Sequence, residues 1–369
     1  MNIRSQAKLF LRKAVACSVA LALVGTDVAL AATDLSDMPL ASSSTATVRP
    51  NVLYVLDDSG SMDWTAMPDE MVGKESNASW RSHLCNTIYY NPSVRYKAPP
   101  QLANGTVFPD QSFTAALNNG YNSGSGTTDL STSFRANGQD TAQPAYYYVL
   151  DSGSVGTGPL DSACLSSAGF SNSYPDRAPD SGTTNGAAFR KVRVTSTSGP
   201  GATDERGNFA NWYSYYRNRL MMMKAATGRA FIELNESYRV GFITINPNSP
   251  ITLSKYLRVS DFDATHKQAF LDKLYGQSTN GSTPLREALS RAGWIFAGKL
   301  GSGLTSGIAA ADDPVQYACQ QNFTILTTDG YWNGNGGKKL DGSSMDNTDG
   351  NAAETATGSD PDRTPVNLT

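Results

Sequence analysis

The sequence is poor in cysteine, histidine and charged residues. Its 369 residues include 4 Cys and 2 His, and only 17% of them are charged. No two cysteines lie close together, so a zinc site built from Cys and His is not expected. The formal net charge of −3 argues against the basic surface that nucleic-acid binding requires. With 33 Gly and 18 Pro, the composition favours a loop-rich exported protein over a compact cytosolic enzyme.

Long hydrophobic runs are also missing. The apolar stretch Ala14 to Val24 is far shorter than the roughly 20 residues that a membrane-spanning helix needs. A basic segment ending at Lys13 precedes it, and the small-residue motif Ala29-Leu-Ala31 follows it, as in a secretory signal peptide. We therefore predict a signal peptide over 1–31, a flexible lead-in over 32–49, and an exported protein without a transmembrane span.

Three cysteines remain once the signal peptide is removed with Cys17. They are Cys85, Cys164 and Cys319, an odd number in a compartment where disulfides persist. At most one internal bridge is expected, with one thiol left over. We favour Cys85 with Cys164, because both lie in the same long segment, although the other pairings remain open.

The stretch from Asn51 to Ser61 organises the rest of the chain. Six mostly apolar residues, typical of a buried parallel strand, run directly into Asp57 and Asp58. Polar groups at the carboxyl ends of such strands hold ligands in open α/β sheets, so Asp57, Ser59 and Ser61 are candidate ligands. Oxygen donors of this kind suit Mg²⁺, Mn²⁺ or Ca²⁺. The alternative is that Asp-Ser-Gly-Ser is only a turn.

Two later residues complete the candidate site. Thr283 lies in a loop that opens a helix running to about Lys299, with Pro284 expected at its first position. Thr283 has a competing interpretation as the N-cap of that helix. Asp329 ends a second apolar strand that begins at Asn322.

Between these motifs the chain changes character twice. Gly, Ser, Asn, Thr and Tyr dominate an insertion over about 63–205, in which we expect short strands starting near Ala145 and Phe189. The predicted elements that follow are a helix from Phe209 to about Glu236, a strand from Tyr238 to Asn246, an edge strand from Ile251 to Val259, and a helix capped by Asp261 or Asp263 that ends near Tyr275. For the aromatic cluster Trp212, Tyr213, Tyr215 and Tyr216 we favour core packing and a join to the insertion over ligand binding.

The order Asp57-x-Ser59-x-Ser61, then Thr283, then Asp329 resembles the metal-ion-dependent adhesion site of von Willebrand factor A domains. The resemblance implies a doubly wound, Rossmann-like α/β sheet over 50–369, ordered 3-2-1-4 and incomplete at its C-terminal side. It also implies that Ser59 and Ser61 bind the ion directly, that Asp57 and Asp329 hold it mostly through water, and that Thr283 binds when the site is engaged. An acidic group of a partner would fill the open position.

Three further stretches, Cys85 to Pro100, Phe209 to Arg217 and Cys319 to Asn333, are similar to tip-associated adhesin and assembly proteins of type IV pili. This resemblance implies a binding module that passes from the periplasm and outer membrane to the cell surface and the pilus tip. It would act in pilus biogenesis and attachment, with minor pilins and an acidic receptor group as partners. Family members usually continue into a C-terminal β-propeller, and this chain stops earlier.

Two other functions compete with adhesion. An aspartyl-nucleophile phosphatase requires a second Asp two residues after the first, but Ser59 stands at that position. No Gly-x-Ser-x-Gly motif occurs either, so an enzyme is not expected. A structural scaffold with a vestigial metal site, whose insertion binds the partner, is the other alternative. The acidic stretch from Asp341 to Asp349 does not match the spacing of an EF-hand, and we expect a solvated loop there.

Overall fold

A computed structural model of the chain describes residues 48–152, 154–155, 162–165 and 188–345. The predicted signal peptide, almost all of the lead-in and the C-terminal residues 346–369 lie outside the described residues. From Arg49 onward the described residues belong to one compact unit. Within them, no helix has both the length and the apolar character required of a membrane span.

A four-stranded mixed sheet forms the centre of the fold, in the order β7-β6-β1-β8. Its strands are β1 (Asn51–Leu56), β6 (Arg239–Thr244), β7 (Tyr256–Asp261) and β8 (Asn322–Thr327). Strand β1 pairs in parallel with both β6 and β8, and β7 is antiparallel to β6. The predicted order 3-2-1-4 is therefore confirmed, as is the α/β class. All six residues of β1 are buried, which explains its nearly continuous apolar sequence.

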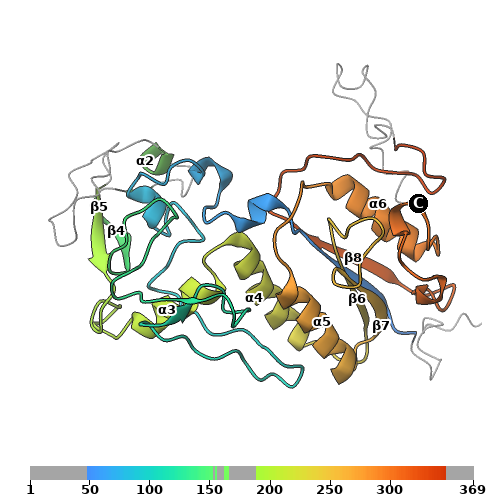
Figure 1. Cartoon of the computed structure of the whole chain (residues 1–369), viewed down its shortest axis with the longest axis horizontal. Coiled ribbons are helices and arrows are strands. Elements are labelled where there is room, and N and C mark those ends of the chain that lie inside the picture. The colour runs from blue at the N-terminus through green and yellow to red at the C-terminus, as the bar shows by residue number, and fades with distance from the viewer. Residues whose placement is uncertain (1–47, 153, 156–161, 166–187, 346–369) are drawn as a thin grey trace, which may run out of the picture. The chain divides into compact units, whose positions relative to one another are not determined.

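Helices cover both faces of this sheet (Figure 1). On one face, Val52, Tyr54 and Leu56 pack with residues of α4 (Arg219–Ile232) and α5 (Ala264–Gly276). On the other face, Leu53 and Val55 pack with α6 (Leu285–Phe296). The alternation follows from the two-residue period of a strand, which points neighbouring side chains to opposite faces. Asp263 caps α5, because its carboxylate accepts from the backbone N–H of His266 at 2.8 Å. Of the two predicted caps, Asp261 and Asp263, the second is therefore confirmed.

The prediction of one helix from Phe209 to Glu236 is wrong. The structure has two helices, α3 (Arg206–Tyr215) and α4, separated by residues 216–218. Asn218 has extended backbone angles, and its side chain caps α4 by accepting from the backbone N–H of Met221 at 2.8 Å. Asparagine is among the best N-cap residues, so a new helix starts where the periodic pattern suggested continuity.

Two other boundaries also differ from the prediction. The edge strand β7 starts at Tyr256, because residues 251–255 form turns in which the backbone N–H of Ile251 donates to Ser306 instead of to a strand. Helix α6 is capped by Pro284, which has φ −82° and ψ 58°, so Pro284 is not its first helical residue. The helix stops at Phe296, and Gly298 then takes a positive φ of 68°, as residues just after helix ends often do.

The insertion and helix α3 share a separate hydrophobic core. It is built largely from aromatic side chains, among them Tyr89, Tyr90, Phe134 and Tyr146 of the insertion and Phe209 and Trp212 of α3. The predicted strands near Ala145 and Phe189 are β4 (Tyr146–Ser152) and β5 (Ala188–Arg193), and they form an antiparallel pair. The remaining small elements are β2 (Ala116–Leu117), β3 (Thr127–Thr128) and α2 (Ser162–Leu165).

The cysteines and the aromatic cluster tie the insertion together. Cys85 and Cys164 form a disulfide, which confirms the favoured pairing, and Cys319 is free and exposed. Trp212 and Tyr213 pack in the core that the insertion shares with α3, whereas Tyr215 packs in the cluster that contains β1. The expected role of these rings in core packing and in joining the insertion to the sheet is confirmed.

Lys224 on α4 predicts a pH dependence of stability. Its ammonium group is buried and donates to the carbonyl oxygens of Tyr275 at 2.9 Å and Gln277 at 2.5 Å. Burial lowers the pKa of Lys224 from 10.5 to about 7. Between these two pH values the unfolded chain binds more protons than the folded one, so stability rises with pH, by up to about 1.4 kcal/mol per unit.

We therefore expect the free energy of unfolding, measured by urea titration, to increase between pH 7 and pH 9 relative to a Lys224→Met variant. Below about pH 7 the two proteins should show parallel pH profiles, because the lysine is then charged in both states. Parallel profiles between pH 7 and pH 9 as well would contradict the assignment.

Candidate functional site

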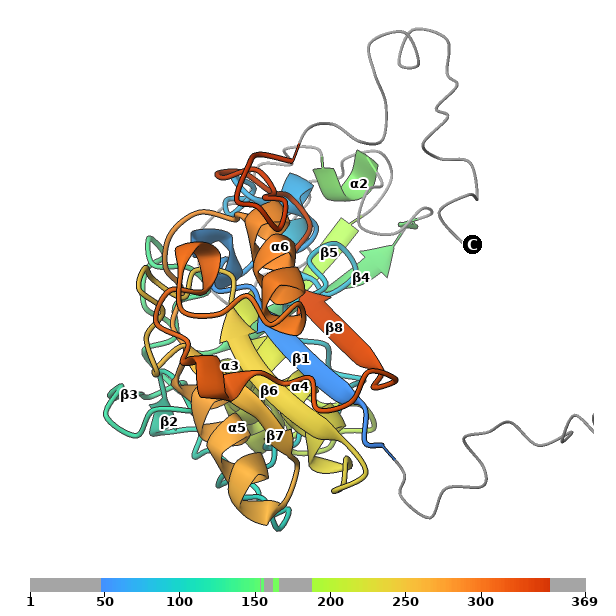
Figure 2. The same cartoon turned by 90° about the vertical axis from the view of Figure 1, so that its right-hand side faces the viewer.

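Three loops meet at the carboxyl edge of β1 and β8, the two strands that lie side by side in Figure 2. The loop after β1 is joined to the loop before α6 by a hydrogen bond from the backbone N–H of Gly60 to the carbonyl of Gly281 at 3.2 Å. The loop before α6 is joined to the loop after β8 through Asn333, whose backbone N–H donates to the carbonyl of Thr283 at 3.0 Å. The loops that carry all five predicted ligands therefore lie at one edge of the sheet.

Asp57 is held rigidly at the end of β1. Its side chain is fully buried, and one carboxylate oxygen accepts from the backbone N–H of Ser59 at 2.8 Å. The other oxygen accepts from the hydroxyl of Thr328 at 2.7 Å. The Oγ atoms of Ser59 and Ser61 are 3.2 Å apart, a separation at which both can bind one ion. The sequence patterns did not identify Thr328 as a partner of Asp57, although Thr328 directly precedes Asp329 in the chain.

Thr283 is 5% exposed and does not cap α6. The N-cap interpretation of this residue is therefore wrong, because the cap position is Pro284 and no side chain makes a capping hydrogen bond there. Its backbone N–H donates to the side-chain oxygen of Asn333 at 2.8 Å. Among the contacts of the described residues, none is a hydrogen bond to the Thr283 hydroxyl, which leaves that oxygen available as a ligand.

Asp329 has a partner that sequence reasoning did not find. Its carboxylate accepts from the guanidinium of Arg219 at 2.7 Å, and the two side chains are 5% and 3% exposed. Arg219 is the first residue of α4, and 110 positions separate the two residues in the chain. No local sequence pattern around Arg219 predicts this contact.

Asp58 points into the structure, away from the candidate ligand set. Its carboxylate is fully buried, forms an ion pair with Lys255 and accepts from the backbone N–H of Asn246 at 3.0 Å. Burial raises the pKa of Asp58, and the bond to Lys255 lowers it. This residue therefore stabilises the loop after β1 by joining it to Asn246, which follows β6, and to Lys255, which precedes β7.

The residues at this edge fit a hard divalent cation. In the described part of the chain, no three His, Cys, Asp or Glu side chains cluster as a metal site. The candidate set instead combines two carboxylates with three hydroxyls, all oxygen donors of the kind that Mg²⁺, Mn²⁺ and Ca²⁺ prefer. Two hydrogen bonds, one from the backbone N–H of Ser59 and one from the hydroxyl of Thr328, fix the orientation of the Asp57 carboxylate. Metal-binding carboxylates are usually held by hydrogen bonds of this kind.

The acidic stretch that begins at Asp341 does not contribute to this edge through any contact of its described part. Asp341 is exposed, and its carboxylate accepts from the backbone N–H and the hydroxyl of Ser343 at 2.8 and 2.6 Å. Such local bonds are typical of a solvated turn. Residues 346–349 lie outside the described residues.

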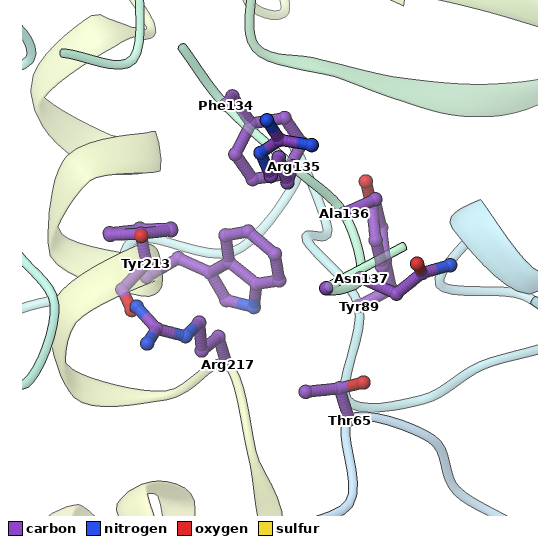
Figure 3. A pocket seen from close by; sticks show the side chains of 10 residues that line it. Thr65, Tyr89, Phe134, Arg135, Ala136, Asn137, Tyr213 and Arg217 are labelled. Atoms are coloured by element: carbon purple, nitrogen blue, oxygen red, sulfur yellow. The ribbon is translucent and has the colours of Figure 1, made fainter. Parts of the chain in front are cut away.

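A second candidate site is a pocket of about 240 Å³ between the insertion and helix α3 (Figure 3). Its walls are Trp212, Tyr213, Tyr89 and Phe134, with the polar side chains of Thr65, Arg135, Asn137 and Arg217. The guanidinium of Arg217 lies over the ring of Tyr213, 4.1 Å from its centre, and burial lowers the pKa of this arginine. Arg217 donates to the backbone carbonyl of Tyr213 at 3.0 Å and interacts electrostatically with Asp63, and Arg135 donates to the backbone carbonyl of Asp140, so the pocket is lined by two guanidinium groups.

Comparison with known proteins identifies relatives of one kind. The chain is 32% identical over 336 residues to the type IV pilus biogenesis factor PilY1 of Pseudomonas aeruginosa strain UCBPP-PA14, a match covering 87% of this chain and 26% of the relative. The PilY1 protein of strain PAK is 33% identical over 300 residues, which cover 78% of this chain and 24% of the relative.

The chain thus spans about a quarter of the length of these relatives. No protein-family profile and no solved structure matches it. The resemblance to pilus proteins that the sequence motifs indicated is confirmed by the relatives. Over the region that they share, the chain is a homologue of the PilY/PilC-type proteins of the type IV pilus system.

Proposed function

We propose that this chain forms a von Willebrand factor A-like binding module with a metal-ion-dependent adhesion site. The observation that carries the proposal is the placement of Asp57, Ser59 and Ser61 at the end of the central strand, joined by hydrogen bonds to the loops of Thr283 and Asp329. The strand order and the helices on both faces of the sheet support the same assignment.

A bound Mg²⁺, Mn²⁺ or Ca²⁺ would supply positive charge that attracts an acidic group of a partner. In this proposal the hydroxyls of Ser59 and Ser61 bind the ion, and Thr283 adds a third hydroxyl when the partner is engaged. Asp57, already oriented by Ser59 and Thr328, holds the ion from the sheet side, mostly through water. Asp329 acts in the same way from the end of β8. The chain binds and does not catalyse.

The names of the relatives support a role in the type IV pilus system. The relatives carry the name of type IV pilus biogenesis factors, so we propose that this module acts in pilus biogenesis and surface attachment. Exported by its signal peptide, it would reach the outer membrane, the cell surface and the pilus tip. Its partners would be minor pilins and a protein or surface receptor that presents a carboxylate.

Calorimetric titration of the purified protein with each of the three cations tests the proposal. We expect saturable binding of one ion and a rise in the melting temperature, because an ion that binds only the folded state stabilises it by about 2.7 kcal/mol at 100 times its Kd. A folded protein that binds none of the three ions would overturn the proposal.

The pocket between the insertion and α3 favours a second candidate function, in which the sheet is a scaffold and the insertion binds the partner. Aromatic walls with two guanidinium groups are suited to a ligand that carries both apolar surface and negative charge. Tight ion binding combined with partner binding that does not depend on the ion would favour this alternative.

A further inference from the structure

Arg219 connects the candidate metal site to the beginning of the insertion. Its guanidinium donates to Asp329 at 2.7 Å and to Asp69 at 2.5 Å, and it also donates to the carbonyl oxygen of Ala66 at 2.8 and 2.9 Å. The guanidinium lies 5.0 Å from the ring centre of Trp64, and the backbone N–H of Arg219 donates to the carbonyl of that residue at 3.2 Å. One buried cation is therefore shared between a candidate ligand and a carboxylate of the insertion.

We infer that Arg219 is an internal competitor of the divalent ion, and that its second bond, to Asp69, determines how strongly it competes. The inference rests on the proposed function and concerns the regulation of the same site. Arg219 would act as a positioning residue: the more firmly Asp69 and the carbonyl of Ala66 hold the guanidinium, the more of the Asp329 carboxylate is available to the ion.

The competition follows from charge and burial. The side chain of Arg219 is 3% exposed, so water screens its charge poorly, and a cation beside a candidate ligand repels a divalent ion bound there. A guanidinium stays charged at every physiological pH. Its influence on the site therefore changes only when its hydrogen bonds are redistributed between Asp329 and Asp69.

The contacts of Arg219 also give the insertion a physical route to the metal site. Thr65, which lines the pocket of Figure 3, lies between Trp64 and Ala66, both in contact with Arg219. Arg217, on the other side of the pocket, is two residues from Arg219 in the turn between α3 and α4. A partner that shifts this turn would change ion affinity, and by linkage the ion would change the affinity for that partner by the same factor.

Calorimetric titration with Mn²⁺ of the wild-type chain and four variants, one of them the Asp57→Ala variant without a functional site, tests the inference. Arg219→Gln removes the competing charge and should tighten ion binding by about tenfold, a typical size for coupling between sites. Asp69→Asn removes the charge of the other carboxylate that holds the guanidinium, so the guanidinium bonds more strongly to Asp329, and ion binding should weaken by about fivefold. Arg219→Lys is the matched control, because it keeps the charge and should bind Mn²⁺ more like the wild type than Arg219→Gln does.

The opposite directions of the two effects are the diagnostic result. If Arg219 only supported the structure, both variants would weaken ion binding together, and that outcome overturns the inference. Wild-type binding that Asp57→Ala abolishes but Arg219→Gln and Asp69→Asn leave unchanged overturns this inference alone. The absence of binding in every protein overturns the proposed function as well. Should Arg219→Gln lack a cooperative melting transition, Asp69→Asn decides, and binding that is unchanged or tighter overturns the inference.

Discussion

The Asp57→Ala variant is expected to bind no Mg²⁺, Mn²⁺ or Ca²⁺ at concentrations that saturate the wild-type protein. The substitution removes a candidate ligand and also the acceptor that fixes the backbone N–H of Ser59 at 2.8 Å. The hydroxyl of Thr328 loses its carboxylate partner at the same time, so the loops after β1 and β8 are no longer tied together there. Calorimetric titration measures the loss directly, and the ion-dependent rise in melting temperature should disappear with it.

The control for this experiment is Asp341→Ala, which removes an exposed carboxylate whose hydrogen bonds to described residues lie within its own turn. Its ion binding should equal that of the wild type. Binding that survives in a cooperatively folded Asp57→Ala protein but is lost in Asp341→Ala would move the ion site to the acidic stretch 341–349. Binding that survives in both variants would require a site at neither position.

The Asp140→Ala variant is expected to lose about 3–5 kcal/mol of unfolding free energy. Asp140 accepts two hydrogen bonds from the guanidinium of Arg81, at 2.8 and 2.7 Å, and the two side chains are 8% and 1% exposed. Without the carboxylate, the buried arginine loses an opposite charge and two hydrogen bonds, and its bonds to Tyr146 and to backbone carbonyls supply no negative charge in their place. Chemical denaturation of both proteins measures the difference.

The matched control is Asp204→Ala, also in the insertion. Asp204 pairs with Arg206 at 2.7 Å, nearly the same distance, but these side chains are 50% and 48% exposed. An exposed pair of this kind contributes little to stability, because water screens its charges, so Asp204→Ala should lose far less unfolding free energy than Asp140→Ala. Equal losses in the two variants would show that burial does not determine the contribution of the Arg81–Asp140 pair.

Much of the central sheet was predictable from local patterns. The apolar run before Asp57 and the one before Asp329 each specify a strand, and both strands lie where they were expected, within one or two residues. The first strand is fully buried, whereas residues 322–325 of the second are exposed. The family resemblance supplied the order of the strands. The turn between α3 and α4 was not predictable in the same way, because Tyr216-Arg217-Asn218 contains neither Gly nor Pro to interrupt the helical pattern.

The boundary errors have a common physical cause. Residues 251–255 have enough apolar character for an edge strand, but Ile251 is buried against the cluster that contains α6 and its backbone bonds to Ser306. A tertiary contact therefore outweighs local strand propensity there. In the same way, Pro284 is suited to the first turn of a helix, yet it takes the cap position.

The sequence by itself determined the chemistry of this protein: the oxygen ligands of the candidate site, the strands that end at Asp57 and Asp329, and the family to which the chain is related. Those features are local patterns of residue type and spacing, which one stretch of chain contains completely. Only the tertiary structure decided that Asp329 is paired with Arg219, that Asp58 is turned toward Lys255, and that Thr328 and Asn333 bind the candidate loops. Each of these contacts joins residues from 50 to 271 positions apart, and no local pattern encodes which distant side chains meet when the chain folds.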